Sequence, residues 1–319
     1  MDANELESKW SGLRPDAQGT FKSLRITGDC IPDLYIGIDL NNTRCLILKL
    51  PERHSTNFVT VVKQNLSLEF FGETNWVLLK LSNALYKDLF NDLILSLYDK
   101  VKALIDVNQY TTILIDVFYR WSEFFEDGSA NILSEEIIMG LVGEMHYLVW
   151  EIENGAPLEI NEILLSWHGP FDRGNDFVFN NRNVEVKTKQ IDALDVMISS
   201  EFQMQPEIGK GLHLIVVDLV KEQEGISLSD LTNKVRSLIV SRMGDFSILL
   251  KAFRQKGLTM LNISNYDHIK FTFVSMLGYD CIRESFPKIN VDTKPRLVNN
   301  VKYNIRISEL GSFIIKRYN

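Results

Sequence analysis

Two acidic residues and a lysine stand close together in a segment that is predicted to form a β-hairpin. The runs "DFVF" and "NVEVK" flank the turn-forming residues "NNR". We expect the turn to centre on Asn181 and Arg182. In that register Asp176 lies opposite Lys187. Because side chains alternate between the two faces of a strand, Glu185 is expected to share a face with both.

A sheet face that carries two carboxylates and an amine is costly to bury unless the charges find partners. Mg²⁺ binds carboxylate oxygens together with water and substrate phosphate, so Asp176 and Glu185 could hold it, with the backbone carbonyl of Val186 as a third ligand. We expect Mn²⁺ to substitute. Such an ion polarises a phosphodiester oxygen and lowers the pKa of a bound water. The ammonium of Lys187 could orient that water and stabilise charge on the phosphate.

A fourth candidate, Glu144, lies in the helical pattern "IIMGLVGEMHYLVWEI". The pattern begins with Ser134 as a helix N-cap and is apolar on nearly every face, which predicts a buried central helix over 134–152. Gly140 and Gly143 would let another element approach closely. A carboxylate in so apolar a setting needs a partner. Glu144 could hold the same ion through water, or a second ion.

Each of these signals also has a purely structural interpretation. A Glu-x-Lys pattern is more often a solvated strand edge, and a single glutamate in a helix usually faces water. His168 and Lys189 could contact phosphate, but a turn and a solvated strand end are the alternatives. Gln190 and Gln203 could help to position water. The interpretation therefore depends on the four charged candidates occurring together in this order.

The elements that must position these residues follow from the apolar patterns. Residues 1 to about 82 alternate short apolar runs with turn signals, which predicts a β-rich module. Residues 86–105 and 110–125 have helical periodicity. Further along, strands are expected at "ILLSW", "DFVF", "NVEVKT", "DVMISS" and "LHLIVVDL", then two helices at "SLSDLTNKVRSLIV" and "DFSILLKAF", then strands at "HIKFTFVSMLGYDCI", "VKYNIRI" and "GSFIIKRY". The fold class is thus α/β or α+β. We expect a β-rich module over 1–125, a core over 126–225, and a basic region over 226–319 that completes the core or contacts DNA.

Composition and charge narrow the class of protein. With 319 residues, of which 45% are hydrophobic and 24% charged, the chain can bury a substantial core. No apolar run approaches the roughly 18 residues that a membrane span needs, so a cytoplasmic protein without membrane contact is expected. Three scattered cysteines and five isolated histidines give no disulfide framework and no zinc site.

The net charge of −8 conceals an asymmetry along the chain. Residues 226–319 carry 15 Lys and Arg against 7 Asp and Glu, while residues 1–225 carry 19 against 35. Basic residues on the predicted C-terminal helices, such as Arg236, Arg242 and Lys251, could neutralise phosphates. A solvated basic surface is the alternative.

Several segments resemble the PD-(D/E)XK nuclease superfamily, and more closely the bacterial PD-(D/E)XK motif proteins found among restriction and phage-defence genes. The segments are "GLVGEMHYL", "WHGP", "NDFVF", "VEVKTK" and "ISSEFQM". The resemblance implies an αβββαβ core like that of restriction endonucleases, Mg²⁺ dependence and hydrolysis of DNA phosphodiesters. It places the family's helix acid on Glu144, its motif acids on Asp176 and Glu185, and its lysine on Lys187. Asn175 stands where the motif's name has proline.

Two functions follow from this resemblance as expectations. The first is a Mg²⁺-dependent endonuclease that cuts double-stranded DNA for restriction or phage defence, with a homodimer and a partner methyltransferase or ATPase as possible assemblies. The second is a non-catalytic nuclease-like subunit that binds DNA or a partner protein. A hydrolase of small phosphoesters is disfavoured, because the sequence has no glycine-rich phosphate loop of the GxxxxGK[ST] type.

Overall fold

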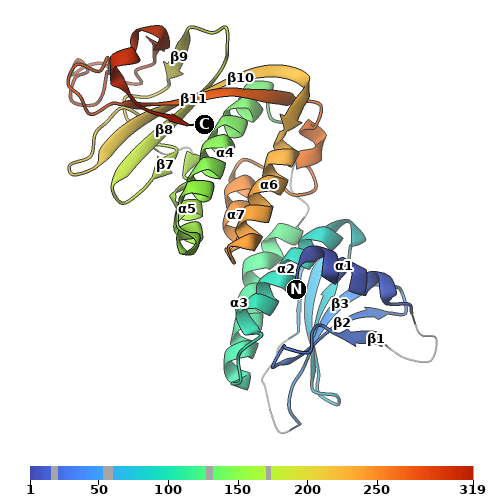
Figure 1. The fold of residues 1–319 in the computed structure, drawn as a ribbon. Helices are drawn as coiled ribbons and strands as arrows, with labels where there is room; N and C mark the ends of the chain where they lie inside the picture. Colours follow the sequence, from blue (N-terminus) through green and yellow to red (C-terminus); the bar gives the residue numbers. More distant parts are fainter. Residues whose placement is uncertain (16–20, 53–59, 127–131, 170–173, 319) are drawn as a thin grey trace. The chain divides into compact units, whose positions relative to one another are not determined.

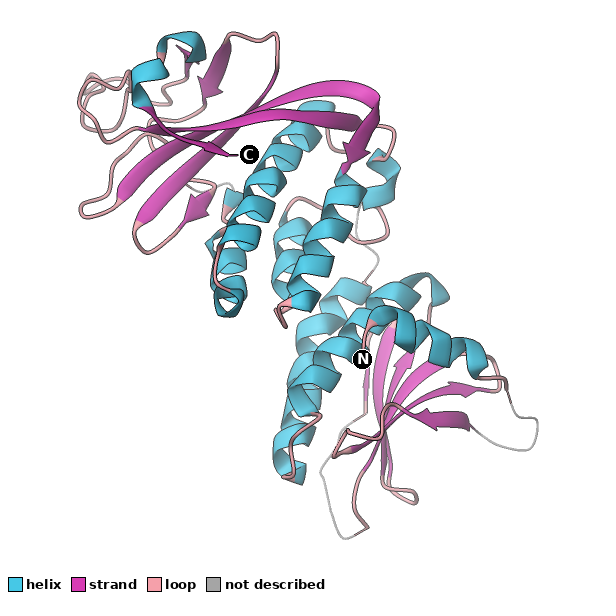
Figure 2. Ribbon diagram, viewed as in Figure 1, coloured by secondary structure: helices cyan, strands magenta, loops and turns pink. Residues whose placement is uncertain are grey.

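The chain folds into two compact units, Met1–Ser129 and Ala130–Asn319 (Figure 1). The computed structural model describes residues 1–15, 21–52, 60–126, 132–169 and 174–318. Both units combine helices with sheets (Figure 2), which confirms the predicted mixed fold class. The expected boundary segment 125–131 lies mostly outside the described residues. No helix in the described ranges is long and apolar enough to cross a bilayer.

Unit 1 contains a six-stranded antiparallel sheet in the order β1-β2-β3-β6-β5-β4. Its strands are β1 Phe21–Arg25, β2 Asp33–Asp39, β3 Arg44–Lys49, β4 Val61–Val62, β5 Leu66–Phe71 and β6 Trp76–Leu81. In β3 the side chains of Cys45 and Leu46, which point to opposite faces, are both buried. The six strands therefore confirm that this part of the chain is rich in β-structure, as its short apolar runs predicted.

Three helices, α1 Ala3–Gly12, α2 Lys87–Val101 and α3 Val107–Ser122, belong to unit 1. Periodicity predicted α2 and α3 but not α1. Helix α1 has only two buried apolar side chains, Leu6 and Trp10, which is too few to give a clear pattern. It is fixed instead by contacts distant in sequence, since the indole Nε1 of Trp10 donates to Asn91 Oδ1 at 2.9 Å.

Unit 2 is built on a five-stranded mixed sheet in the order β13-β11-β10-β8-β7. Its strands are β7 Phe177–Val178, β8 Arg182–Gln190, β10 Gly211–Ser227, β11 Lys270–Asp280 and β13 Ile314–Tyr318. Strands β8 and β10 are parallel, and the other neighbours are antiparallel. A separate two-stranded sheet joins β9 Asp195–Ile198 to β12 Tyr303–Arg306. Strands from 226–319 thus complete the main sheet.

The helices of unit 2 are α4 Glu135–Asn154, α5 Ile160–Ser166, α6 Leu228–Ser241 and α7 Phe246–Gln255. The succession α4, β7, β8, β10, α6, β11 follows the predicted αβββαβ order, with α5, β9 and α7 added. The strand predicted at "ILLSW" was wrong, because its first four residues belong to α5 and only Trp167, just after the helix, forms an isolated β-bridge. Ile160, Ile163 and Leu164 are all buried, and this spacing of three and four is helical.

Helix α4 begins at the predicted N-cap, where the side chain of Ser134 accepts from the backbone N–H of Ile137. It packs against β8 on one face of the sheet (Figure 1). At the crossing, a Cβ atom built on Gly143 would lie 1.8 Å from Thr188 Oγ1, whereas one on Gly140 would meet nothing within 4 Å. Gly143 therefore sets how closely α4 approaches the strand that carries the candidate site.

Candidate active site

The β7–β8 hairpin turns at Asn180 and Asn181, one residue earlier than predicted. Phe177 pairs with Val184, so the predicted register was wrong by two residues. Arg182 is the first residue of β8, and its guanidinium has two partners outside the strand. It lies 2.6 Å from Glu151 and 4.1 Å from the centroid of the Phe179 ring.

A register shift of two residues leaves every side chain on its original face. Asp176, Glu185 and Lys187 therefore still converge. The Nζ of Lys187 lies 2.7 Å from Glu185 Oε1, and the backbone N–H of Val186 donates to Asp176 Oδ2 at 2.7 Å. The face opposite α4 thus brings the two acids and the lysine together.

Glu185 lies in unusually apolar surroundings for a carboxylate. It is 1% exposed and pairs in register with Leu214, a member of the apolar cluster on this face of the sheet. Burial, followed by the negative charge of Asp176, raises the pKa of Glu185 to about 8, although Lys187 acts in the opposite direction. Its buried Oε1 atom lies 2.7 Å from the Nζ of Lys187, which is the charged partner of this carboxylate among the described residues. The carboxylate would therefore be stabilised by a further positive partner.

Glu144 reaches the same place from α4. Its Oε2 accepts a hydrogen bond of 2.6 Å from the indole Nε1 of Trp167. A Cβ atom on Gly169 would lie 2.2 Å from that Oε2 and 2.9 Å from Asp176 Oδ1, so the two carboxylates flank this glycine. Burial and then the charge of Asp176 raise the pKa of Glu144 well above its usual value. Gly169 thus brings residues 167–169 into the site.

Two amide side chains hold the acids and the lysine in place. The Nδ2 of Asn175 donates to the backbone oxygen of Gln203 at 2.7 Å and lies 3.4 Å from Glu185 Oε2. The Oε1 of Gln203 accepts from the Nζ of Lys187 at 3.3 Å and from the backbone N–H of Ser199 at 2.8 Å. The sequence singled out Gln203 only as a water-positioning candidate and assigned no contact to Asn175. The position of Asn175 directly before Asp176 was the sequence signal that could have indicated its contact with the site.

A cavity of about 570 Å³ opens beside these residues. It is lined by Gly169, Gly174, Asn175, Asp176, Ser199, Ser200, Phe202 and Gln203. Its volume is ample for a phosphate group and several waters. Phe202 at its edge is 60% exposed, which is unusual for so large an apolar side chain.

The residues present fit a divalent cation bound by few protein ligands. Asp176 and Glu185 provide carboxylate oxygens beside a polar cavity, and a cation would offset the burial and the charge of Asp176 that raise the pKa of Glu185. Among the described residues, however, no group of three or more His, Cys, Asp or Glu has metal-binding spacing. Glu144 bonds to Trp167 instead, which is compatible with a contact to the ion through water.

The remaining predicted residues lie at the margin of the site or outside it. The backbone N–H of His168 donates to the carbonyl of Asp176 at 2.6 Å, while its side chain is exposed. Lys189 pairs with Asp218 at 2.8 Å. The Oε1 of Gln190 accepts from the backbone of Lys221 at 3.2 Å, and Arg242 donates to the carbonyl of Gly155 beyond α4. These four residues therefore have structural partners in the described chain.

Comparison with known proteins identifies a family but no individual relative. No curated protein and no solved structure matches the chain. Residues 6–308 match the model of the family described as "Putative PD-(D/E)XK family member, (DUF4420)". The match spans both units and includes all four charged candidates, in agreement with the resemblance found in the sequence. The chain therefore belongs to this PD-(D/E)XK-like family.

Proposed function

We propose that the chain is a Mg²⁺-dependent endonuclease that hydrolyses phosphodiester bonds of double-stranded DNA in a restriction or phage-defence system. The observation that carries the proposal is the setting of Glu185. Its carboxylate is buried between Asp176 and Lys187 beside a polar cavity, where its pKa rises to about 8. Such strong perturbation beside a cavity is typical of functional sites. The nuclease-like family supports the same class of reaction.

Hydrolysis requires a water oxygen to attack phosphorus while the bond to one sugar oxygen breaks and that oxygen gains a proton. Asp176 and Glu185, with the carbonyl of Val186, would hold Mg²⁺, which would supply positive charge beside the phosphate. Lys187 contributes a fixed ammonium at the developing negative charge. Its position depends on Gln203, which accepts from its Nζ. Glu144 would act through water, since its Oε2 already has Trp167 as a donor.

A second candidate function is a non-catalytic subunit that keeps the nuclease fold. It is favoured by the direct pairing of Lys187 with Glu185 and because, among the described residues, no three acids, histidines or cysteines are placed to hold one metal ion. Titration with Mn²⁺ separates the two candidates. Binding that is lost in Glu185→Gln supports the nuclease, while no binding at all supports the non-catalytic subunit. In the nuclease case, cutting both strands together would need two sites, which a homodimer supplies.

The direct test is nicking of supercoiled plasmid, both unmodified and phage-derived, with and without Mg²⁺. We expect the wild type to cut only with the ion and Glu185→Gln to lose cutting. Asp218→Asn is the matched control, because it removes a carboxylate that is also paired with a β8 lysine, at 2.8 Å, on the same sheet face. Equal cutting by Glu185→Gln and the wild type would contradict the proposal. If the wild type binds metal without cutting either plasmid, the assay is repeated with a methyltransferase or ATPase partner added.

A further inference from the structure

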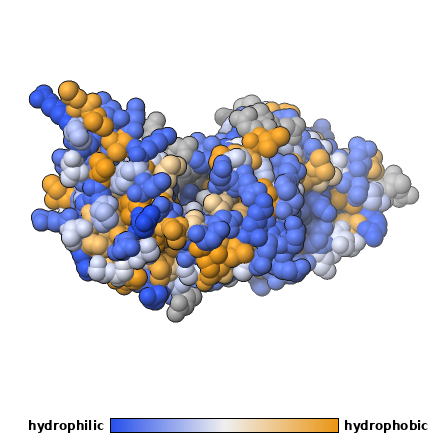
Figure 3. Space-filling model, turned by 90° about the horizontal axis from the view of Figure 1, so that it is seen from above, coloured by the Kyte–Doolittle hydropathy of each residue, from blue (hydrophilic) through white to orange (hydrophobic). Residues whose placement is uncertain are grey.

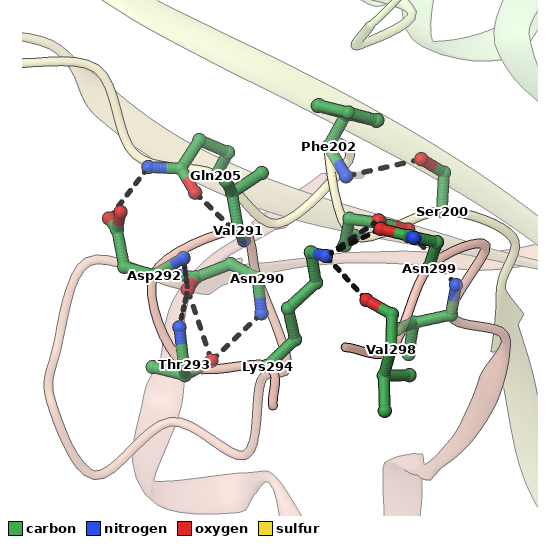
Figure 4. A network of polar contacts seen from close by, with 12 residues as sticks. Ser200, Phe202, Gln205, Asn290, Val291, Asp292, Thr293, Lys294, Val298 and Asn299 are labelled. Atoms are coloured by element: carbon green, nitrogen blue, oxygen red, sulfur yellow. Dashed lines mark hydrogen bonds and ion pairs between the residues drawn. The ribbon is translucent and has the colours of Figure 1, made fainter. Parts of the chain in front are cut away.

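The segment between β11 and β12 contains a loop whose composition contrasts with the rest of the chain. Residues 288–302, "KINVDTKPRLVNNVK", carry four basic residues and one acid in a protein of net charge −8. The loop lies against residues 200–205, and Figure 4 shows the polar contacts between the two segments. It is therefore a basic element attached to a defined part of unit 2.

The base of the loop is fixed by two amide side chains. Asn290 is 4% exposed, and its Oδ1 accepts from the backbone N–H groups of Asp292 at 3.0 Å and Thr293 at 2.9 Å. Gln205 donates to Asp292 Oδ2 at 2.9 Å and accepts from the N–H of Val291 at 3.0 Å (Figure 4). These bonds give the start of the loop one defined conformation.

Lys294 closes the loop from inside. Its Nζ donates to the carbonyl of Val298 at 2.5 Å and to Asn299 Oδ1 at 3.0 Å (Figure 4), and it lies 3.7 Å from the buried Glu201. The other oxygen of Glu201 accepts from the N–H of Val301 at 3.0 Å. Residues 295–297, which we call the loop tip, are all exposed.

The loop is joined to the wall of the candidate active-site cavity. Ser199, Ser200, Phe202 and Gln203 line that cavity, and Glu201 and Gln205 from the same turn bind the loop. The turn 199–205 therefore both forms a wall of the cavity and anchors the loop.

The loop tip and Lys302 combine positive charge with an exposed apolar side chain. Arg296 and Lys302 are exposed, and within the described ranges neither forms an ion pair. Leu297 is 93% exposed. Exposure of a leucine alone decides nothing, since hydrophobic residues stand among hydrophilic ones over much of the surface (Figure 3). What distinguishes Leu297 is its place in the sequence between Arg296 and Lys302, on a loop that hydrogen bonds hold in one conformation.

We propose that the loop tip, together with Lys302, binds the DNA duplex beside the phosphate that is cut. Arg296 and Lys302 contact backbone phosphates, and Leu297 packs against sugars and base edges in the minor groove. This inference rests on the proposed nuclease function and adds a second DNA contact to it. The closing of the loop by Lys294 lowers the conformational cost of binding, because the tip is already ordered.

The first test measures binding of the full chain to a fluorescein-labelled duplex by anisotropy, with Ca²⁺ in place of Mg²⁺, over a range of salt concentrations. Arg296→Ala should weaken binding about threefold to tenfold and lower the slope of log affinity against log salt by about one. The control is Lys234→Ala on α6, which removes one charge from the helical side of the sheet. Equal losses in both variants would overturn the proposal, because they would indicate unspecific attraction.

The second test separates apolar contact from charge. Leu297→Ser should weaken binding about threefold to tenfold at every salt concentration without changing the slope. Leu158→Ser is the control, since Leu158 is 94% exposed and precedes α5. Both sites are exposed, so circular dichroism should show unchanged folding. Wild-type affinity in Leu297→Ser and in Arg296→Ala would overturn the proposal.

The proposed function and this inference fail in different ways. Plasmid cutting in Mg²⁺ by the wild type, with unaltered KM in Arg296→Ala, would keep the nuclease and reject the loop contact. A raised KM with an unchanged kcat would support both. A wild type that neither binds duplex nor cuts plasmid would reject both.

Discussion

Each unit contains a carboxylate paired with a lysine on its sheet, and the two pairs differ in how fully the carboxylate is satisfied. In unit 1 Lys80 lies 2.8 Å from Asp39, whose other oxygen also accepts from the backbone N–H groups of Asn41 and Thr43 at 2.9 Å. In unit 2 Lys187 lies 2.7 Å from Glu185, whose other contact is the 3.4 Å approach of Asn175. Similar ion-pair distances thus conceal different environments.

The pKa values shift in opposite directions for this reason. Burial alone would raise the pKa of Asp39, but the hydrogen bonds from Lys80 and Thr43 outweigh it and lower the pKa. For Glu185, burial and the charge of Asp176 outweigh Lys187 and raise the pKa to about 8. The first pair keeps its carboxylate ionised, whereas the surroundings of the second favour the neutral acid and would favour the carboxylate only with a further cation. An incompletely satisfied buried acid is therefore the better guide to function than the ion pair itself.

The largest expected contrast between the pairs is in activity. Lys187→Met should lower plasmid cutting about 100-fold to 1000-fold, because it removes the cation proposed to stabilise the phosphate. Lys80→Met removes the equivalent lysine from unit 1 and should leave cutting unchanged. Initial rates of cutting at equal concentrations of folded protein measure both effects. Comparable losses in the two variants would show that the pairs do not differ in function.

Stability should change with opposite signs when the acids are replaced by amides. Asp39→Asn should lower the free energy of unfolding by about 2 kcal/mol, because three donors lose a charged acceptor. Glu185→Gln should leave it unchanged or raise it, since the amide resembles the neutral acid that the raised pKa of Glu185 favours. Urea unfolding followed by circular dichroism gives both values. Destabilisation of similar size in both variants would remove the basis of the comparison.

The approach of α4 to the site can be tested with two glycines of one helix. Gly143→Ala should lower the free energy of unfolding by about 1–3 kcal/mol, since its Cβ would lie 1.8 Å from Thr188 Oγ1. Gly140→Ala has nothing within 4 Å and should raise it by about 0.5–1 kcal/mol. Thermal unfolding with EDTA measures both. If Gly143→Ala is as stable as Gly140→Ala, the close contact between α4 and β8 is not required.

The last contrast is the pH dependence of stability in metal-free protein. The raised pKa of Glu185 stabilises the fold fully below the usual value of 4.5, and this contribution is lost as pH rises through about 8. The lowered pKa of Asp39 acts oppositely, so its contribution is lost as pH falls below 3.8. The melting temperature of the wild type should therefore decline between pH 4.5 and 8 more than that of Glu185→Gln. Parallel curves for the two proteins would contradict the raised pKa.

Local patterns predicted most elements because each has a strong signal within a few residues. The strands of unit 1 and the helix that begins after Ser134 are examples. The prediction failed where the signal was short. The run "ILLSW" suits a strand or a helix, and only the burial of Ile160, Ile163 and Leu164 decides for a helix. The hairpin register also failed, because the contacts of Arg182 with Glu151 and Phe179 are not visible in a local pattern.

The sequence by itself determined which residues are the candidates, since alternation along a strand places Asp176, Glu185 and Lys187 on one face in any register of the same parity. Tertiary structure decided what surrounds them. Burial against Leu214, the contact of Glu144 with Trp167 and the bonds of Gln203 join segments far apart along the chain. The pKa of an acid depends on its solvent exposure and on charges in space, so these properties arise only when the chain is folded.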